Sequence, residues 1–458
     1  MTRFMRLHDD LRLALRSVLR TPGLTALTAG AIACGIGAVM VTITLYHARA
    51  GHPIWWKENQ LFAVMLDNRG ADHEGEQLER HPEYPPFLVT YRDAKALYQS
   101  NIPIRSMMMF RSTRVVEPDR AGLKPFSAYV RVTTADFFDM FDVPFLYGTH
   151  WARSADDGPE PVVVLGRHLN DKLFGGSNSV GKLVTLNGKQ FRVIGIIDNW
   201  MPQPKFYDLS STSFDIPEDL YMPFRWLTAL QLPIAGKVNC VSPRASFGSI
   251  NDLLTQDCNW LEYWVEMPGA QQRQRFRAFV DNYAREQKGY GRFPRPLNNR
   301  IVNVPTWLAM NDVIGDDSRL QAGLCVLFLA VCILNTLGLM LAKFLSEAPI
   351  TGLRRALGAS RRDIIQQHLV EVVVVGVIGG LCGVLLSYVG LWAIRVLTYV
   401  PAQDDNPAHL ALAQSLSHMD LSMLLLGVAA SFLTGILAGV YPAWRIGRLE
   451  PASFLRAH

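Results

Sequence analysis

The stretch VVVVGVIGGLCGVLLSYVGLWAI, residues 372–394, decides the fold, because none of its side chains carries a charge. A helix rises about 1.5 Å per residue, so about 20 apolar residues cross the hydrocarbon core of a bilayer. Similar uncharged runs lie at residues 24–46, 322–342 and 421–443. Any one run could be a buried core helix, but such helices are usually shorter. Four runs predict an α-helical membrane protein with four transmembrane helices, one near the start of the chain and three near the end.

Lysine and arginine predict the orientation of these spans, because both resist translocation and collect in cytoplasmic loops. Five precede the first span, five lie between the second and third, and three follow the fourth, whereas residues 397–420 carry none. We therefore expect both termini in the cytoplasm and residues 49–318 and 397–420 outside it. The basic residues of these flanks are Arg3, Arg6, Arg12, Arg16, Arg20, Lys343, Arg354, Arg355, Arg361, Arg362, Arg445, Arg448 and Arg456.

Segment boundaries follow from the same patterns. Residues 1–23 repeat apolar side chains at helical spacing and break at Pro22, which predicts an amphipathic elbow helix on the inner membrane surface; a plain basic flank is the alternative. The first apolar run is too long for a secretory signal. The expected segments are the elbow 1–23, the first span 24–46, a periplasmic core domain 49–318, the second span 322–342, a cytoplasmic coupling segment 343–367, the third span 368–396, a periplasmic loop 397–420, the fourth span 421–443 and a cytoplasmic tail 444–458.

The net charge of +5 is unevenly distributed. Residues 49–318 hold 30 basic and 31 acidic residues, so the basic excess lies in the membrane portion. This placement indicates topology and contact with anionic lipid, whereas a nucleic-acid surface needs a basic patch on a folded domain. We expect no nucleic-acid partner.

The six cysteines divide between spans and the external domain. Cys34, Cys325, Cys332 and Cys382 fall in spans, where a free thiol acts as a small apolar residue. Only Cys240 and Cys258 fall outside, and we predict a disulfide between them that stabilises the domain by roughly 3 kcal/mol; two unpaired buried thiols are the alternative. The histidines are scattered without a zinc-ligand spacing, so no metal site is predicted.

The external domain is expected to be α+β. Two alternating apolar runs flank Asn187-Gly188, the strongest short signal for a β-hairpin. Further strands are expected at 126–132 and 161–165, and helices at 134–141, 167–174 and 270–288. The aromatic and cysteine content of residues 226–295 suggests a second subdomain inserted in the first.

One motif resembles a nucleotide-binding loop. Residues 176–182 match GxxxxGK, but Leu183 stands where Ser or Thr should hold Mg²⁺, and a hairpin follows instead of a helix. We interpret it as a structural turn. Acidic doublets such as Asp156-Asp157, Asp316-Asp317 and Asp404-Asp405 are more often solvated turns than acid–base pairs. We predict no catalytic residue and no cofactor bound by this chain.

Small residues recur at helical spacing in the spans, which predicts close packing of helices. The fourth span carries Gly427, Ser431, Gly435 and Gly439, and the third carries Gly376 and Gly380 with a second pair, Gly379 and Gly383; Ala26, Gly30, Cys34 and Ala38 form a weaker stripe in the first. Ionisable groups are scarce in the spans: Glu371 and Arg395 lie at opposite ends of the third, and Asn335 is the main central polar residue. No ion relay is predicted.

The coupling segment is the most specific part of the sequence. Pro349 can begin a helix, Gly358 can end it in a left-handed conformation, and Ser360 with Asp363 predicts a capping box for the next helix. Such an apolar-faced helix between two spans suits docking into a groove on a cytosolic partner; an amphipathic helix lying on lipid is the alternative. The predicted coupling residues are Ile350, Gly352, Leu353, Arg354, Arg355, Leu357 and Gly358.

Nearly the whole chain resembles the MacB/FtsX-type ABC transporter permeases. The resemblance is carried by DLRLALRSVLRTPGLTALTAGAIACGIGA, GLRRALGASRRDI and GVYPAWRIGRLEPASFLRA in the membrane portion, and by AYVRVTTADFFDMF and LFGGSNSVGKLVTLNGKQFRVIGIID outside it. It implies an inner-membrane permease with Porter-like and Sabre-like external subdomains. It also implies a dimer whose coupling helix receives the movement of a separate cytosolic ATPase, which uses ATP and Mg²⁺, and relays it outward.

The sequence departs from the family pattern in one place. The usual Arg-Glu-Ile-Gly before the basic pair is Pro349-Ile-Thr-Gly352, so an acidic contact to the ATPase is missing, and we hypothesise a heterodimer with an intact second permease. A fully active homodimer purified with its ATPase would remove that hypothesis. The expected function is export or efflux of a periplasmic substrate through an adaptor and an outer-membrane channel. Lipoprotein extraction and a signalling scaffold that regulates an external hydrolase are the alternatives.

Overall fold

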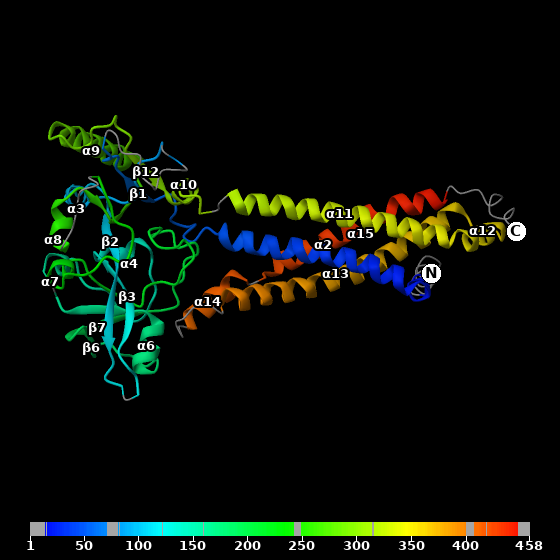
Figure 1. Cartoon of the computed structure of the whole chain (residues 1–458), viewed down its shortest axis with the longest axis horizontal. Coiled ribbons are helices and arrows are strands. Elements are labelled where there is room, and N and C mark those ends of the chain that lie inside the picture. The colour runs from blue at the N-terminus through cyan, green and yellow to red at the C-terminus, as the bar shows by residue number, and fades with distance from the viewer. Residues whose placement is uncertain are drawn as a thin grey trace. The chain divides into compact units, whose positions relative to one another are not determined.

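The structure is a computed structural model that describes residues 14, 16–70, 81, 83–120, 122–158, 160–241, 249–313, 316–399, 407–417 and 419–447. The chain forms two compact units (Figure 1). Unit 1 contains residues 1–50, 314–406 and 413–458, and unit 2 contains residues 51–313 and 407–412. Most of the expected elbow 1–23, the end of the expected tail and Asp404-Asp405 lie outside the described residues.

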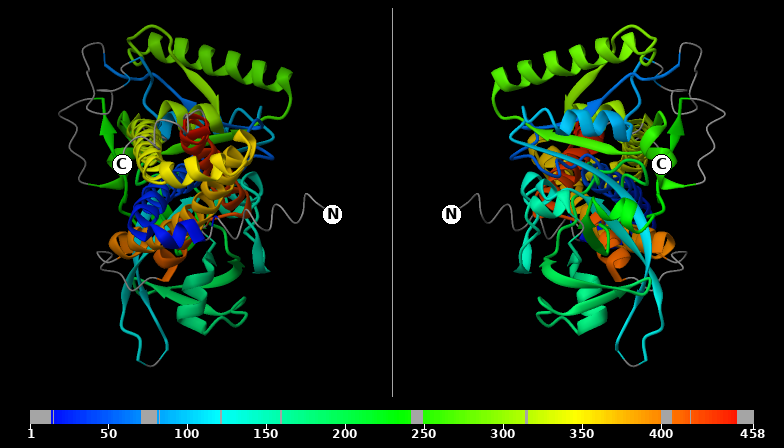
Figure 2. Two further views of the ribbon diagram at one scale, coloured as in Figure 1. Left: turned by 90° about the vertical axis from the view of Figure 1, so that its right-hand side faces the viewer. Right: turned by 90° about the vertical axis from the view of Figure 1, so that its left-hand side faces the viewer.

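Unit 1 is built on four long helices. These are α2 (Pro22–Arg49), α11 (Asp316–Ser346), α13 (Arg361–Tyr399) and α15 (Leu421–Gly447), and each is long and apolar enough to cross a membrane. Seen end on in Figure 2, they lie side by side as a bundle. Each contains one of the four uncharged runs and extends beyond it. A short helix, α12 (Ala348–Ala356), also belongs to unit 1, and the residues of α14 (Pro407–Leu416) are divided between the two units.

Helix α13 packs against α2 and α15 through two different glycine faces. Gly379 and Gly383 face α2, where an added Cβ would lie 2.8 Å from the Cβ of Ile32 and 3.0 Å from that of Ile36. Gly376 faces Gly435 of α15, and a Cβ on Gly380 would meet the Ser431 hydroxyl at 2.6 Å. Close approach of the backbones therefore needs glycine on both faces.

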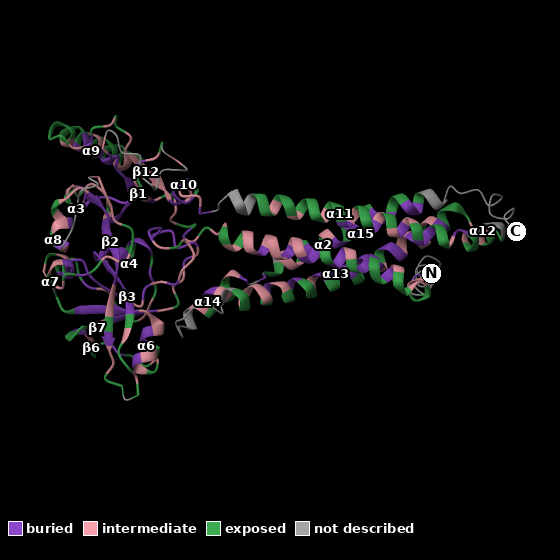
Figure 3. Ribbon diagram, viewed as in Figure 1, coloured by how far each residue is buried: buried purple, intermediate pink, exposed green. Residues whose placement is uncertain are grey.

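The two remaining small residues of the α15 stripe also face neighbouring helices. A Cβ on Gly427 would lie 2.5 Å from Met40 Sδ of α2, and one on Gly439 would clash with the Val372 side chain of α13. Outward-facing side chains of the bundle stay exposed and apolar, most clearly along α11 (Figure 3). An exposed apolar surface of this extent is typical of helices surrounded by lipid.

Unit 2 is an α+β domain. Its first half contains β1 (Leu61–Met65), α3 (Tyr91–Tyr98), β2 (Arg105–Glu117), β3 (Phe126–Thr133), α4 (Asp136–Met140), β4 (Phe145–Gly148), α5 (Ser154–Asp157), β5 (Val162–Leu165), α6 (Arg167–Phe174), β6 (Leu183–Leu186) and β7 (Lys189–Ile197). Its second half contains β8 (Leu220–Pro223), α7 (Trp226–Ala229), β9 (Asn239–Cys240), α8 (Ile250–Thr255), β10 (Cys258–Asn259), β11 (Glu262–Glu266), α9 (Ala270–Gly289), β12 (Arg300–Asn303) and α10 (Val304–Met310).

Ten of these strands form one mixed sheet in the order β12-β1-β11-β2-β3-β8-β5-β7-β4, with β6 paired to β2 and β7. The β3–β8 and β5–β7 pairs are parallel and the other pairs are antiparallel. Both faces are covered, because successive residues of one strand enter different cores: Met107 and Met109 of β2 belong to one cluster, and Met108 and Phe110 to the other. Burial on both faces explains why several strands are apolar at every position.

The local turn signals of unit 2 appear in the structure as the sequence suggests. β6 and β7 form a hairpin around Asn187 and Gly188, whose φ angles are +47° and +76°. Helix α6 ends at Gly175 in the left-handed conformation. Positive φ favours asparagine and glycine, so these positions depend on the residue types found there.

The expected second subdomain, residues 226–295, shares the main sheet of unit 2, and its boundaries stay a prediction. Strand β11 lies inside this stretch and pairs with both β1 and β2 of the main sheet. Trp260 and Trp264 are buried in the cores on either side of that sheet. The aromatic residues that marked the stretch in the sequence are therefore core residues of the whole unit. Cys240 and Cys258 face each other across the β9–β10 pair and are bonded.

A charged network is buried in unit 2. Arg131 of β3 has no exposed surface and is paired with Asp208 and with Glu218, whose Oε1 is 2.5 Å from Nη2. Lys205 lies 2.6 Å from the same Glu218 oxygen. Burial by itself would raise the pKa of Asp208, but Arg131 and Lys205 hold it well below its usual range. Burial and the neighbouring Asp208 raise the pKa of Glu262 well above its usual range. Two cations, Arg131 and Lys205, therefore face the carboxylates of Asp208 and Glu218.

Candidate functional site at the α12 end of the helices

Helix α12 connects α11 to α13 and is held in place at both ends. On the α11 side, the amide of Glu347 donates to Lys343 O at 3.2 Å and that of Thr351 donates to Glu347 O at 3.1 Å. On the α13 side, Gly358 has a φ of +105°. Ser360 and Asp363 then form reciprocal bonds: the Ser360 amide donates to the Asp363 carboxylate at 3.1 Å, and the Asp363 amide donates to the Ser360 hydroxyl at 3.2 Å. Short, capped connections of this kind restrict how α12 can move.

The exposed face of α12 is apolar. Ile350, Leu353 and Leu357 are 37%, 56% and 80% exposed. Arg354 is partly buried and donates from Nη1 to Gln367 Oε1 of α13 at 2.8 Å, so it braces the helix. The side chains of Arg361 and Arg362 are exposed at the start of α13. An apolar face beside two cations therefore stands open.

The other predicted coupling residues fall on the same short segment. Gly352 lies within α12, and a Cβ there would meet no atom within 4 Å. Gly358 follows the helix and also has open space around its Cα. Arg355 lies in α12, and its side chain is outside the described set. The structure thus brings together the predicted coupling residues whose side chains it describes.

A polar cluster, here named the Ser17 cluster, lies beside α12 and consists of Ser17, Thr25, Lys343, Glu347, His368 and Glu371. Lys343 Nζ is 2.5 Å from Glu371 Oε1, and each side chain is 1% exposed. The same Nζ donates to Thr25 Oγ1 of α2 at 3.1 Å. His368 is 3% exposed, and its Nδ1 lies 3.6 Å from Glu371 Oε2. Its ring contacts that of Phe344 at 4.3 Å.

Ser17, in the helical residues 16–20 before α2, closes the cluster. Its Oγ lies 2.6 Å from Glu371 Oε1 and 3.0 Å from Glu347 Oε1. The Ser17 cluster thus connects α2 and the segment before it with α11 and α13.

Sequence reasoning missed this cluster. It placed Lys343 in a cytoplasmic loop as a topology signal, and it treated Glu371 as an isolated charge at the end of a span. The available signal was the antiparallel arrangement of the second and third spans, which brings the end of one beside the start of the other. A lysine and a glutamate at those two ends can then meet.

Glu347, His368 and Glu371 could hold a metal ion, because each offers one ligand atom within 4.8 Å of the others. The donor set of one imidazole and two carboxylates suits zinc. However, the Lys343 ammonium already supplies a positive charge at Glu371, and a second cation beside it would be repelled. We therefore interpret the cluster as an ion-pair network and propose no metal site.

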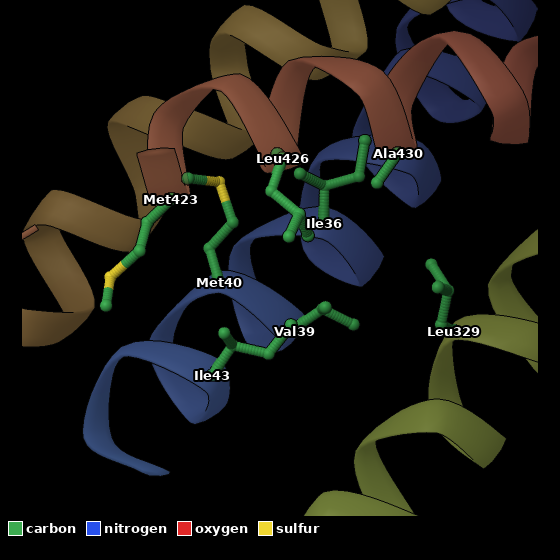
Figure 4. Close-up of a pocket in the computed structure, with 9 residues that line it drawn as sticks. Ile36, Val39, Met40, Ile43, Leu329, Met423, Leu426 and Ala430 are labelled. Carbon is green, nitrogen blue, oxygen red and sulfur yellow. The ribbon is translucent and has the colours of Figure 1, made fainter. Parts of the chain in front are cut away.

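A small apolar pocket lies between α2, α11 and α15 of the bundle (Figure 4). The labelled residues are contributed by all three helices. Its free volume is about 20 Å³, which is room for little more than one water molecule. The pocket is a packing defect of the bundle, and it is too small to be a passage for a substrate.

The loop that resembles a nucleotide-binding motif is a turn in unit 2. The amide of Gly181 donates to Val193 O at 2.8 Å, and that of Lys182 donates to Ser179 O at 3.0 Å. A phosphate-binding loop needs such amides free. The Lys182 ammonium lies over the ring of Phe174 at 5.0 Å. The geometry offers no cradle for a phosphate.

Comparisons with known proteins agree with this architecture. The model of the MacB-like periplasmic core domain matches residues 25–246, and the model of the FtsX-like permease C-terminal domain matches residues 322–451. The first covers most of the sheet of unit 2, and the second covers α12 and the three spans around it. The chain belongs to the MacB/FtsX-type ABC transporter permeases. It is a membrane protein of four apolar helices with an α+β domain of the periplasmic MacB type.

Two relatives illustrate the similarity. The chain is 22% identical over 454 residues to the pyoverdine export ATP-binding/permease protein PvdT of Pseudomonas syringae pv. syringae, which covers 98% of this chain and 59% of that protein. It is 25% identical over 374 residues to the macrolide export ATP-binding/permease protein MacB of Syntrophobacter fumaroxidans, covering 71% of this chain and 46% of that protein. The chain spans about half the length of the curated relatives it matches.

Solved structures with similarity to the chain include two external domains. The periplasmic region of MacB from Actinobacillus actinomycetemcomitans is 16% identical with a TM-score of 0.34, covering 56% of this chain and 94% of that one. The extracellular domain of the transporter YknZ from Gram-positive bacteria is 14% identical with a TM-score of 0.31, covering 53% of this chain and 100% of that one.

Proposed function

We propose that this chain is the permease subunit of an ABC exporter and that α12 receives the movement of a cytosolic ATPase. The observation that carries the proposal is the exposed apolar face of Ile350, Leu353 and Leu357, held between α11 and α13. The relatives are named as ATP-binding/permease proteins for export, which supports the same class of function. In this proposal α12 and both termini face the cytoplasm of a bacterial inner membrane, and unit 2 faces the periplasm.

The route of the substrate follows from what the bundle offers. The pocket between α2, α11 and α15 is apolar and holds about 20 Å³. A hydrophilic cargo would need a polar, wider passage. We therefore propose that movement of the helices is relayed to unit 2, which acts on its substrate outside the bilayer.

Further partners belong to the same proposal. A second permease, of the same or a different kind, would complete a dimer, and a periplasmic adaptor with an outer-membrane channel would carry an exported substrate onward. The exposed Arg361 and Arg362 predict that the groove receiving α12 is apolar with an acidic rim. Purification of the complex in mild detergent, followed by mass spectrometry, identifies which of these proteins accompany the chain.

The decisive experiment places a charge on the α12 face. Leu353→Asp and Leu357→Asp should each abolish co-purification of the ATPase, because a carboxylate cannot be buried in an apolar groove without a partner. Leu297→Asp is the matched control, since Leu297 is 43% exposed but belongs to unit 2. Equal retention of the ATPase by the α12 variants and the control would contradict the proposal.

A further inference from the structure

The Ser17 hydroxyl faces two carboxylates but has one hydrogen to donate. Glu371 Oε1 is 2.6 Å from Ser17 Oγ, and Glu347 Oε1 is 3.0 Å from it. When both carboxylates are ionised, the hydroxyl can serve only one of them, and the other then meets a lone pair at hydrogen-bonding distance. Two arrangements are therefore available: Ser17 bonded to Glu371, or Ser17 bonded to Glu347.

These two carboxylates belong to different moving parts. Glu347 directly precedes α12, and its carbonyl accepts the Thr351 amide inside that helix. Glu371 lies in the part of α13 near α12 and is fixed by Lys343, which also contacts Thr25 of α2. A shift of α12 moves Glu347 relative to Ser17, while Glu371 stays with the bundle.

Because the Lys343–Glu371 pair is buried, the two hydrogen-bond arrangements of Ser17 are distinct states. Both side chains are 1% exposed, and removing one partner of such a pair leaves an uncompensated buried charge. The pair is therefore a fixed reference, and Ser17 is the contact that can exchange. A two-state element of this kind is what a coupling mechanism requires, because packed helices do not deform continuously.

We propose that Ser17 is a positioning residue that switches its hydrogen bond between Glu371 and Glu347, and so transmits the position of α12 to α2. The inference rests on the proposed function, since it names how the docking of an ATPase on α12 reaches the first span. Bonding to Glu347 ties the segment before α2 to α12, and bonding to Glu371 ties it to α13. Movement of α12 therefore changes which helix the start of α2 follows.

The first test compares Ser17→Ala with Ser387→Ala in the full chain bound to its ATPase. Ser387 is fully buried, and its hydroxyl donates to Val384 O of its own helix at 2.7 Å, so the control loses the same group without losing a link between helices. Ser17→Ala should bind the ATPase as the unchanged chain does but should lose about fivefold or more of the permease-dependent change in ATP hydrolysis. Ser17→Thr keeps the hydroxyl and should restore it.

The second test needs no ATPase. Spin labels are attached to Leu27→Cys on α2 and Leu357→Cys next to α12, both exposed positions, after the four span cysteines are changed to alanine. With the Ser17 cluster unaltered, two distances between the two spin labels should be observed. Glu347→Gln should give one, because its amide can donate to Ser17 Oγ and hold the hydroxyl on Glu371.

The outcomes separate the two proposals. Suppose that no ATPase binds, but that the two distances between the spin labels become one in Glu347→Gln. The docking proposal then fails and the switch stands. If the ATPase binds and Ser17→Ala matches Ser387→Ala in hydrolysis, the switch is overturned. The switch is also overturned if the unaltered cluster gives a single distance between the spin labels and Glu347→Gln gives the same distance.

Discussion

Unit 1 and unit 2 obtain stability in opposite ways. The sheet of unit 2 buries aromatic and aliphatic side chains in two cores, one on each face, and encloses a network of paired charges around Arg131. The helices of unit 1 leave many apolar side chains exposed and approach each other through glycine. Burial from water stabilises unit 2, whereas close packing must do so where lipid replaces water.

The contrast also separates the roles of buried charge. In unit 2 the network around Arg131 joins β3 to the segment between β7 and β8, so its loss should destabilise the domain. In unit 1 the Ser17 cluster joins helices that are proposed to move relative to each other. Similar chemistry therefore serves a fixed structure in one unit and a transmission point in the other.

The largest expected effect comes from removing the central cation of unit 2. Arg131→Met leaves Asp208 and Glu218 with less compensation in a buried site and should destabilise unit 2 by about 3–5 kcal/mol. Arg167→Met is the control, because Arg167 and its partner Asp198 are 42% and 40% exposed, and its effect should stay below about 1 kcal/mol. Amide hydrogen exchange in β3 and β8 measures the stability of unit 2, and exchange in α2 and α13 measures that of unit 1. Equal destabilisation of unit 2 by Arg131→Met and Arg167→Met would contradict the special role of the buried network.

A pH effect is expected in unit 2. Burial raises the pKa of Asp156 from its ordinary value to about 7, although the Ala135 amide and Trp151 indole donate to it. The folded state thus holds this proton more tightly than the unfolded state. The stabilisation of unit 2 by protonated Asp156 is complete below about pH 4 and is lost as the pH rises through about 7. The free energy of unfolding should change by a few kcal/mol, since each unit of pKa shift corresponds to ~1.4 kcal/mol.

Asp156→Asn should remove that part of the pH dependence. The free energy of unfolding of unit 2, measured from about pH 4 to pH 8 in both proteins, should fall more steeply in the unchanged chain than in the variant. Identical slopes would show that the Asp156 carboxyl does not titrate differently in the folded state.

The disulfide gives an intermediate effect. Cys240→Ala removes the bond to Cys258 and should destabilise unit 2 by roughly 3 kcal/mol if the loop-entropy estimate holds for a separation of 18 residues. Cys382→Ala, which removes an exposed free thiol of α13, should change little. Thermal unfolding with and without a reducing agent measures the effect, and reduction should reproduce it in the unchanged chain and in Cys382→Ala but not in Cys240→Ala.

The smallest effect should come from helix packing in unit 1. Gly379→Ala places a Cβ 2.8 Å from Ile32 Cβ and 3.1 Å from Ala29 O, and should cost about 1–3 kcal/mol as α2 and α13 separate. Gly338→Ala on α11 meets nothing within 4 Å and should be neutral or slightly stabilising. Unfolding in detergent, followed by helix content, compares the two; similar losses would mean that close approach does not stabilise the bundle.

Much of the fold follows from local patterns. The length of the uncharged runs predicts the four long helices, and Asn187-Gly188 predicts the β6–β7 hairpin, because both depend on neighbouring residues alone. The face of α12 formed by Ile350, Leu353 and Leu357 is visible for the same reason. The pairing of residues 226–295 with the main sheet was not visible in the sequence, because strand pairing joins distant parts of the chain.

Periodicity and turn chemistry act over a few residues, so the four apolar helices, the hairpin and the apolar face of α12 could be predicted from the residues alone. Which glycine face of α13 meets α2 and which meets α15 depends on tertiary packing. That packing also brought Ser17 to Glu347, 330 positions away, and buried Lys343 against Glu371. Such contacts depend on how helices pack, and no local pattern encodes that arrangement.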